Sequence, residues 1–218
     1  MRETAPDARV ILHVAQPENV ARWFRGITGD GGVTDFDVIG FSFYELWSDV
    51  DMQSIDDYVA AWRNEFGRDV MIVETAYPWT LDNADGYGNI LGATALDTAY
   101  ATSVAGQRDY MIELVGEVVR GGGSGVMYWE PAWITSGLRD LWDTGSSWEN
   151  NALFDFDGNA HAGMDWMTRG SGKSSVSRRG LTRRSGQAWG AIPHCCVFAA
   201  RQAPAFPTQT WATRCSAW

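Results

Sequence analysis

The sequence predicts an α/β fold with a parallel sheet, because short β-rich runs alternate with longer helical patterns. Four apolar runs, at residues 10–15, 38–43, 70–74 and 125–129, are nearly continuous, as is typical of strands buried on both faces. Helical patterns fill the intervals, so the order is β-α-β-α-β-α-β. The three expected helices span residues 18–27, 55–66 and 96–120.

Both a doubly wound sheet and a (β/α)8 barrel have this order, and the placement of polar and aromatic residues favours the barrel. These residues collect at the carboxyl ends of the expected strands, at His13, 42–44, Glu74 and 129–130. Barrel enzymes build their active sites at that end from several strands. No glycine-rich nucleotide motif follows the first run. Since four strands cannot close an eight-stranded barrel, we expect a partial (β/α)8 TIM barrel of about four β/α units.

Length and composition indicate one globular domain followed by a chemically different tail. The chain has 218 residues, of which 45% are hydrophobic, and this is enough for one ordinary core. The net charge is −10, yet eight of the 17 basic residues and none of the 27 acidic ones lie in residues 168–218. We expect residues 1–167 to form the domain and residues 168–218 to be a basic tail, either disordered or translated out of frame.

These properties argue against several classes of function. Residues 1–167 are strongly acidic, whereas nucleic-acid binding needs clustered positive charge. The tail alone could bind a nucleic acid or an anionic surface. No apolar run approaches the roughly 20 residues that cross a membrane, and residues 1–10 lack the pattern of a secretory signal. We therefore expect neither a nucleic-acid nor a membrane partner. All three cysteines lie in the tail, so the domain has no disulfide framework.

Glu74 is the sharpest candidate for chemistry, because it follows a buried apolar run. Alone, a glutamate at the end of a strand is more often a member of an ordinary ion pair. Here aromatic residues follow it closely, at Tyr77 and Trp79. Aromatic rings pack against the C–H faces of pyranose sugars, so a carboxylate beside them indicates a sugar site.

The stretch 74–80, Glu-Thr-Ala-Tyr-Pro-Trp-Thr, resembles the seventh-strand signature of the arabinogalactan endo-β-1,4-galactanases, glycoside hydrolase family 53. Further stretches are similar to this family's segments in the right order. The chain thus resembles the C-terminal half of the family's catalytic domain over nearly all of residues 1–167. The other similar segments are 10–13 for the fifth strand, 36–44 for the sixth, 126–133 for the eighth and 150–158 for the closing segment.

The resemblance implies a retaining mechanism with Glu74 as the nucleophile. Retaining glycosidases use two carboxyl groups roughly 5 to 5.5 Å apart, one as nucleophile and one as acid/base. In this family the acid/base is a glutamate after an asparagine on the fourth strand, which would lie before Met1. Glu45 and Glu130 are weaker substitutes: we expect a solvated loop carboxylate at Glu45 and a structural hydrogen bond at Glu130.

The resemblance also implies residues that contact the sugar. The candidates are one histidine and four aromatic side chains near the expected strand ends. The alternative for each is a place in a buried network or in the interface between barrel and helices. The candidate substrate-binding residues are His13, Tyr44, Trp47, Trp79 and Trp129.

Residues 82–89 offer oxygen ligands at alternate positions, the spacing by which a tight loop can wrap a calcium ion. Taken alone, this composition is more often a turn. Bacterial members of the family are similar in binding structural calcium between this loop and the one after the eighth strand. Tyr87 stands where the family has histidine and Asn83 where it has aspartate, which weakens the case. The implied ligands are Asn83, Asp85, Asn89, Ser146 and Glu149.

The resemblance therefore implies an endo-acting retaining glycoside hydrolase that cleaves β-1,4-galactan or galacto-oligosaccharides from the arabinogalactan side chains of pectin. Family members are secreted, and their chemistry needs no cofactor. Two interpretations stay open: an inactive or carbohydrate-binding barrel fragment, and a barrel glycosidase for another β-linked glycan. A half-barrel would expose unpaired strand edges, so we expect residues 1–167 alone to be aggregation-prone and inactive.

Overall fold

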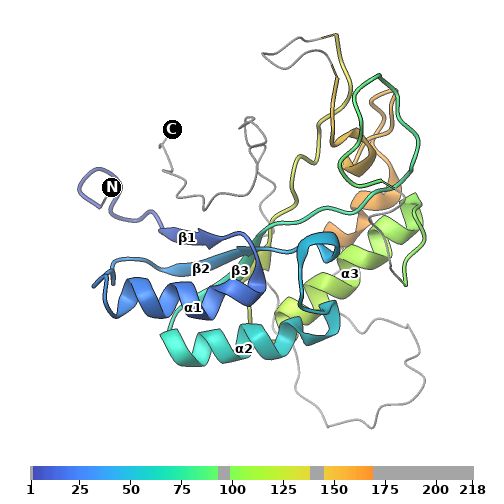
Figure 1. Ribbon diagram of the computed structural model, residues 1–218. Helices are drawn as coiled ribbons and strands as arrows, with labels where there is room; N and C mark the ends of the chain where they lie inside the picture. Colours follow the sequence, from blue (N-terminus) through green and yellow to red (C-terminus); the bar gives the residue numbers. More distant parts are fainter. Residues whose placement is uncertain (1, 93–98, 138–144, 169–218) are drawn as a thin grey trace, which may run out of the picture.

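The computed structural model describes residues 2–92, 99–137 and 145–168, which form a parallel sheet with helices along one face (Figure 1). The strands pair in the order β1-β2-β3-β4, and every pair is parallel. This is part of a (β/α) barrel, as the sequence predicts. The strands are β1 (Ile11–Val14), β2 (Val38–Ser42), β3 (Asp69–Glu74) and β4 (Gly125–Val126); the helices are α1 (Pro17–Thr28), α2 (Ile55–Phe66) and α3 (Val104–Arg120); short 3-10 helices are η1 (Glu45–Trp47), η2 (Met52–Ser54), η4 (Glu149–Asn151) and η5 (Ala162–Met167).

The helix boundaries follow from local residues. α2 has the predicted bounds, and it ends because Gly67 adopts a left-handed conformation with a φ of +61°. α1 extends one residue beyond the prediction at each end. α3 starts later than predicted, because the hydroxyl of Ser103 caps it by accepting a hydrogen bond from the backbone N–H of Gly106. The predicted helix is therefore wrong for residues 99–103, and residues 93–98 lie outside the described part of the chain.

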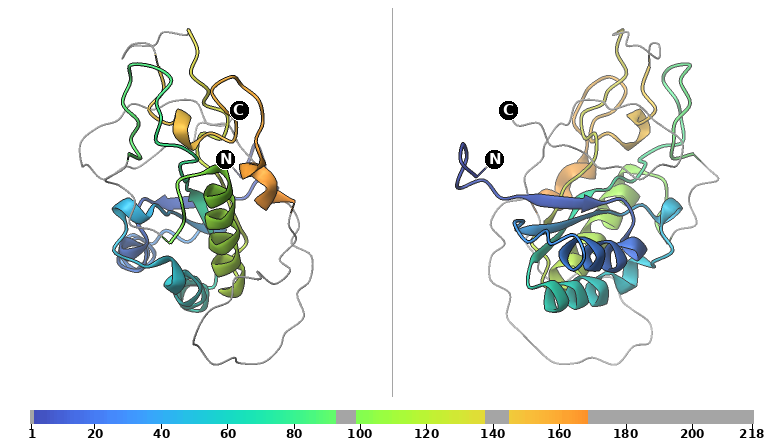
Figure 2. Two further views of the ribbon diagram at one scale, coloured as in Figure 1. Left: turned by 90° about the vertical axis from the view of Figure 1, so that its right-hand side faces the viewer. Right: turned by 60° about the vertical axis from the view of Figure 1, so that its left-hand side comes forward.

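The two faces of the sheet differ in burial. Ile39 and Phe41 of β2 are fully buried, and the Phe41 ring lies 5.2 Å from that of Trp62 on α2. On the opposite face His13 and Met71 are only half-buried, since no described residues form a second layer over them. The prediction of strands buried on both faces is correct for β2 and wrong for β1 and β3. Figure 2 shows the helices gathered along the other face.

The last strand, β4, is shorter than the predicted 125–129. Its regular pairing with β3 covers Gly125 and Val126 alone. The chain nevertheless continues beside β3. The backbone N–H groups of Met127 and Trp129 donate to the carbonyls of Ile72 and Thr75 at 2.9 and 2.8 Å. These bonds hold the start of the segment after β4 against the end of β3.

A buried polar network on α3 joins the segments that follow β3 and β4. Gln107 Nε2 lies 2.7 Å from the carbonyl oxygen of Tyr77 and 3.1 Å from that of Asn151. The hydroxyl of Tyr128 also lies 2.7 Å from the Asn151 carbonyl. Buried polar groups must be paired in this way to avoid a desolvation cost. As a result, the two segments rise side by side from the carboxyl ends of the strands (Figures 1 and 2).

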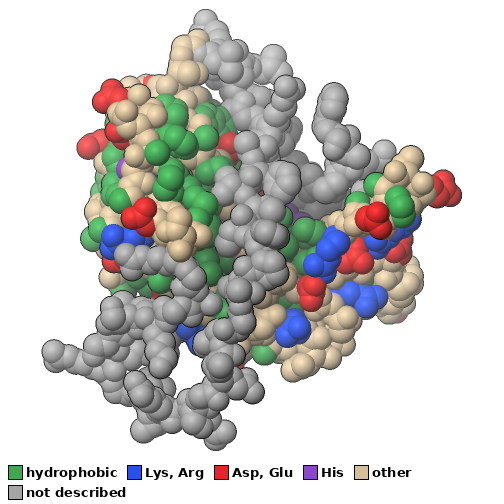
Figure 3. All heavy atoms as spheres, turned by 180° about the vertical axis from the view of Figure 1, so that it is seen from behind, with side chains coloured by type: hydrophobic (Ala, Val, Ile, Leu, Met, Phe, Trp, Pro, Cys, Tyr) green, Lys and Arg blue, Asp and Glu red, His purple; other side chains and the backbone are tan. Residues whose placement is uncertain are grey.

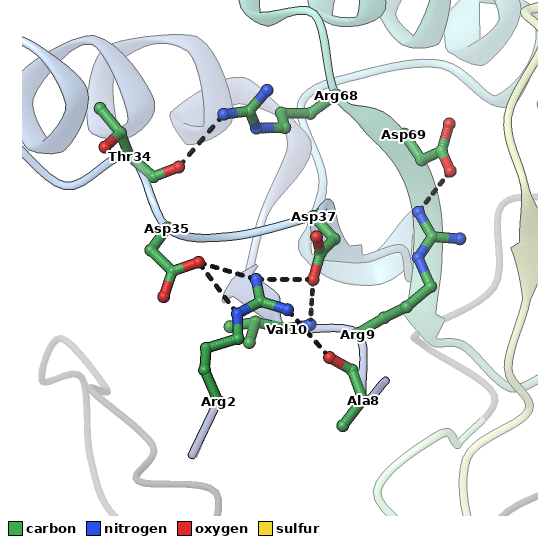
Figure 4. A network of polar contacts seen from close by, with 9 residues as sticks. All are labelled: Arg2, Ala8, Arg9, Val10, Thr34, Asp35, Asp37, Arg68 and Asp69. Atoms are coloured by element: carbon green, nitrogen blue, oxygen red, sulfur yellow. Dashed lines mark hydrogen bonds and ion pairs between the residues drawn. The ribbon is translucent and has the colours of Figure 1, made fainter. Parts of the chain in front are cut away.

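The opposite end of the sheet carries a charged network (Figure 4). Arg2 donates hydrogen bonds to the carboxylates of Asp35 and Asp37. The backbone N–H of Val10 donates to Asp37 at 2.6 Å, and this bond is the main cause that lowers the pKa of Asp37. An ion pair also joins Arg9 to the start of β3. Seen from behind, hydrophobic side chains gather instead over the segments after β3 and β4 (Figure 3). The charged network of Figure 4 and this apolar surface therefore lie at different ends of the molecule.

Two predictions concern residues outside the described part. The basic tail lies there apart from Thr168, and so do its cysteines.

Within residues 2–92, 99–137 and 145–168, no helix combines the length and the apolar character needed to span a membrane.

Candidate active site

Glu74 is the last residue of β3, so its side chain lies at the carboxyl end of the sheet. The pairing register shifts between Phe41 and Ser42, which places Ser42 opposite Glu74. The hydroxyl of Tyr44 donates to Glu74 Oε1 at 3.0 Å. Burial raises the pKa of Glu74, whereas the hydrogen bonds from Tyr44 and Ser42 lower it by stabilising the charged form. The carboxyl is thus half-buried yet held by hydroxyl donors.

A line of polar groups crosses three strands at this end. His13 Nε2 on β1 lies 2.7 Å from Ser42 Oγ on β2, and Ser42 hydrogen-bonds Glu74 on β3. Burial lowers the pKa of His13, so its imidazole is neutral at neutral pH. Burial also raises the pKa of Tyr44 well above its ordinary value, and the charge of Glu74 adds to this effect. Tyr44 therefore stays protonated and remains a donor to Glu74. The structure thus brings two of the predicted sugar-contacting residues, His13 and Tyr44, to Glu74.

An aromatic wall extends from the strand ends toward solvent; we define it as Trp129, Trp148, Tyr44 and Trp47. The Trp148 ring lies 6.3 Å from that of Trp129 and 5.9 Å from that of Tyr44. The Tyr44 and Trp47 rings are 4.8 Å apart, and Trp47 is 41% exposed. Trp148 and Tyr44, in the middle of the wall, are buried, whereas Trp129 at one end is partly buried and Trp47 at the other is exposed. The sequence analysis did not select Trp148 as a site residue. The one feature that could have indicated it is its place in the segment that returns to the sheet after β4.

Trp79, another predicted sugar-contacting residue, makes different contacts. Its ring lies 4.9 Å from that of Phe156 and 5.3 Å from that of His161. Its backbone N–H donates to the carbonyl of Asn150 at 2.8 Å. Trp79 therefore ties the segment after β3 to the closing segment of the chain, and the rings it contacts are not those of the aromatic wall.

Two other glutamates lie near the strand ends. Glu130 has a φ of +47°, a left-handed conformation that costs on the order of 1–3 kcal/mol in a residue other than glycine. Burial raises the pKa of Glu130 to about 7, and the charge of Glu74 adds to this. Glu45 is half-buried, so the expected solvated carboxylate is wrong. Burial raises the pKa of Tyr110, and the charge of Glu45 raises it further, which places Glu45 near α3.

The structure also brings together part of the predicted calcium-binding residues. Asp85 Oδ2 accepts hydrogen bonds from the backbone N–H of Ser146 and from the hydroxyl of Thr135, both at 2.8 Å. The same hydroxyl contacts Glu149, whose other oxygen accepts from a backbone N–H. Burial raises the pKa of Glu149, and the charge of Asp85 contributes. One hydroxyl hydrogen cannot be donated to two carboxylates at once, and no ion pair to a Lys or Arg among the described residues involves either carboxylate. Thr135 was missed from the sequence.

The other two predicted calcium-binding residues differ from each other. Asn89 Oδ1 is buried and has no hydrogen-bond partner among the residues that the structure describes, so it is available as a ligand. The Asn83 amide donates to the carbonyl of Tyr87 at 2.6 Å and so closes its own loop. Among the described residues, no group of three or more His, Cys, Asp or Glu side chains is placed to hold a metal. Carboxylates and neutral oxygens fit calcium better than a transition metal.

Comparison with known proteins identifies the family. The sequence model described as glycosyl hydrolase family 53 matches residues 1–167. This chain belongs to glycosyl hydrolase family 53. An arabinogalactan endo-β-1,4-galactanase of Cellvibrio japonicus is 46% identical over 154 residues, 71% of this chain and 41% of that protein. An endo-β-1,4-galactanase of Bacillus subtilis is 33% identical over 168 residues, 72% of this chain and 39% of that protein.

Solved structures agree with the assignment to family 53. The family 53 catalytic domain of Ignisphaera aggregans superposes with a TM-score of 0.68 at 30% identity, covering 76% of this chain and 47% of that one. A fungal β-1,4-galactanase gives a TM-score of 0.57 at 22% identity, which supports the fold. The present chain spans about two fifths of the length of the curated relatives that it matches. The predicted family and partial-barrel fold are confirmed.

Proposed function

We propose that this chain is the part of a retaining endo-β-1,4-galactanase that carries the nucleophile, Glu74. The observation behind the proposal is a carboxylate at the carboxyl end of β3, held by the hydroxyl of Tyr44 at 3.0 Å beside the aromatic wall. Both curated relatives bear the name of an endo-β-1,4-galactanase. Their names favour galactan, or galacto-oligosaccharides, over another β-linked glycan.

In the proposed reaction, the Glu74 carboxylate attacks the anomeric carbon and the glycosidic bond to the leaving sugar breaks. The leaving oxygen takes a proton from an acid/base glutamate roughly 5 to 5.5 Å away, and water then cleaves the galactosyl ester. The hydrogen bonds from Tyr44 and Ser42 favour the ionised form of Glu74 that attacks, and so oppose the effect of burial on its pKa. We assign the acid/base to a segment outside this chain, after an asparagine on the fourth strand of the barrel. His13 orients one of the donors to Glu74, Ser42, through its hydrogen bond to the Ser42 hydroxyl.

The aromatic wall would bind the sugar rings on the approach to Glu74. Its exposed end is Trp47, and Trp129 at the other end is partly buried. Rings in series favour a polymer over a single sugar, because successive pyranose faces can pack against successive rings. A polymer of this kind is too large to enter a cell, so we propose that the protein acts outside it. A carbohydrate-binding fragment without activity remains the second candidate, since the described residues supply the wall and the nucleophile without an assigned acid/base.

The test uses a completed barrel, which we define as the full chain joined at Met1 to the amino-terminal half of the Cellvibrio japonicus galactanase. We expect it to release reducing sugars from β-1,4-galactan at least about tenfold faster than from mannan or xylan, because aligned polar groups discriminate between sugar hydroxyl patterns. Faster release from mannan or xylan would assign another glycan. Galactan binding without release would favour the carbohydrate-binding candidate.

We also propose that a calcium ion is held between residues 82–89 and the segment at 145–149. Asp85 and Glu149 would supply the charge, with Ser146 and Asn89 Oδ1 as neutral ligands. The ion would supply positive charge between the two carboxylates. It would join the segments after β3 and β4, which border the aromatic wall, and take no part in the chemistry.

Calcium is expected to stabilise the completed barrel by about 1–3 kcal/mol at concentrations well above its Kd, because it binds the folded state preferentially. A thermal melt in calcium against chelator measures this shift. Asp85→Asn and Glu149→Gln should abolish the shift, whereas Asp82→Asn, in the same loop with an exposed side chain, should preserve it. An equal shift with magnesium, or a shift that survives both ligand variants, would contradict the proposal.

A further inference from the structure

Glu130 carries a group that the proposed mechanism does not use. Its Oε1 is buried and has no hydrogen-bond partner among the described residues. We propose that this oxygen binds a hydroxyl of the sugar ring that Glu74 attacks, which makes Glu130 a substrate-specificity residue. The inference rests on the proposed function, because it assigns another part of the same site.

The backbone holds Glu130 in place from both sides. On one side the backbone N–H of Trp129 donates to the carbonyl of Thr75 at 2.8 Å, directly after Glu74. On the other side the carbonyl of Pro131 accepts from the backbone N–H of Leu153 at 2.7 Å. Between these anchors Glu130 keeps a φ of +47°, a conformation that a glutamate adopts only when its surroundings impose it. The side chain is therefore held beside the end of β3, where the sugar would lie.

The unpaired atoms at this point fit a hydroxyl. Trp129 Nε1, on the preceding residue, is likewise buried without a partner among the described residues. One residue thus offers an unused donor and the next an unused acceptor. A buried polar atom left without a partner is costly, whereas a sugar hydroxyl can both donate and accept. Binding of the sugar would therefore satisfy atoms that the protein alone leaves unsatisfied.

The charge of the site also favours a neutral ligand that can both accept and donate a hydrogen bond. Burial raises the pKa of Glu130 to about 7, with a further contribution from the charge of Glu74. Near neutral pH, Glu130 is therefore partly protonated while Glu74 carries the negative charge. A protonated carboxyl donates from one oxygen and accepts at the other, so it can bind a hydroxyl without adding a second charge beside the nucleophile.

The test measures kcat/KM of the completed barrel on an aryl β-galactoside and on its 2-, 3-, 4- and 6-deoxy analogues. Glu130→Ala is expected to lower kcat/KM on the parent roughly 10- to 100-fold, as for the loss of a hydrogen bond to a carboxyl group. For the analogue that lacks the bound hydroxyl, the loss should be less than about threefold, because the interaction is already absent. Glu130→Gln should keep more activity than Glu130→Ala. Asp57→Asn on the exposed side of α2 is the matched control.

Two results would overturn the inference. An equal loss on the parent and all four analogues would indicate a structural role. Recovery of the activity of Glu130→Ala on a dinitrophenyl galactoside, whose leaving group needs no proton, would make Glu130 the acid/base instead. Circular dichroism of each variant separates misfolding from either result, and Glu130→Gln keeps the shape of the side chain if Glu130→Ala does not fold.

Failure of the proposed function gives a different pattern. If the completed barrel cleaves the aryl galactoside but not galactan, the polymer assignment fails while the comparison of analogues still decides the role of Glu130. If it cleaves neither, calorimetric binding of galactobiose and its deoxy analogues to the parent protein and Glu130→Ala decides it. Equal affinities of the two proteins for galactobiose would then overturn the inference.

Discussion

Glu74→Ala is expected to lower the kcat of the completed barrel on galactan by on the order of 10⁴-fold or more, with little change in folding. Removal of a nucleophile abolishes the covalent step, and the remaining groups supply only binding and orientation. The carboxyl is held by Tyr44 and Ser42 at the carboxyl end of β3, so no nearby group replaces it without movement. Release of reducing sugar from galactan measures the loss.

Chemical rescue distinguishes a nucleophile from an essential structural residue. With azide added, Glu74→Ala should convert an activated aryl β-galactoside into the α-galactosyl azide, because azide fills the space of the carboxylate and attacks from the same face. Glu18→Gln, an exposed carboxylate on α1, should behave as the parent does. A β-configured azide, or activity of Glu74→Ala within tenfold of the parent, would remove Glu74 from this role.

The chain without an added amino-terminal half is expected to self-associate and to release no detectable sugar from galactan. β1 and β4 each pair with a single neighbour among the described strands, which leaves one edge of each open. The face of the sheet away from the helices is only half-buried at His13 and Met71. Light scattering and a thermal melt of the chain alone, compared with the completed barrel, measure the difference.

We attribute the expected self-association to the open edges of β1 and β4 and to the half-buried face of the sheet. Adding the amino-terminal half as a separate polypeptide should lower the light scattering, because it covers the same edges and the same face. Release of sugar from galactan then provides the functional readout, because the proposed reaction at Glu74 needs both halves of the barrel. A cooperative melt of a monomeric chain together with galactan hydrolysis would show that the described residues are sufficient alone.

Local patterns predicted those elements whose determinants are local. α2 has the expected bounds because its apolar spacing and Gly67 both act within a few residues. β2 is apolar on both faces and is also buried on both faces. The start of α3 was predicted too early. Residues before Ser103 continue the helical spacing, but the cap at Ser103 sets the first turn. The burial of β1 and β3 depends on a second layer, which no local pattern reports.

The candidate site was predictable where a residue ends a strand. Glu74 is the last residue of β3 and His13 the next to last of β1, and parallel strands bring their carboxyl ends to one edge. Trp148 and Thr135 were not predictable, because the chain returns to the site through segments without regular structure. The left-handed φ of Glu130 was not predictable either, since glutamate does not favour it.

The contact between Trp47 and Trp148 has a consequence for synthesis on the ribosome. Their rings lie 6.3 Å apart although about a hundred residues separate them in the chain. A chain emerges at about 5–20 residues per second, so Trp47 waits several seconds for its neighbour. During that interval β1, β2 and β3 can already pair, but the aromatic wall cannot yet form. The wall can therefore assemble only after Trp148 has been synthesised, later than the pairing of the first three strands.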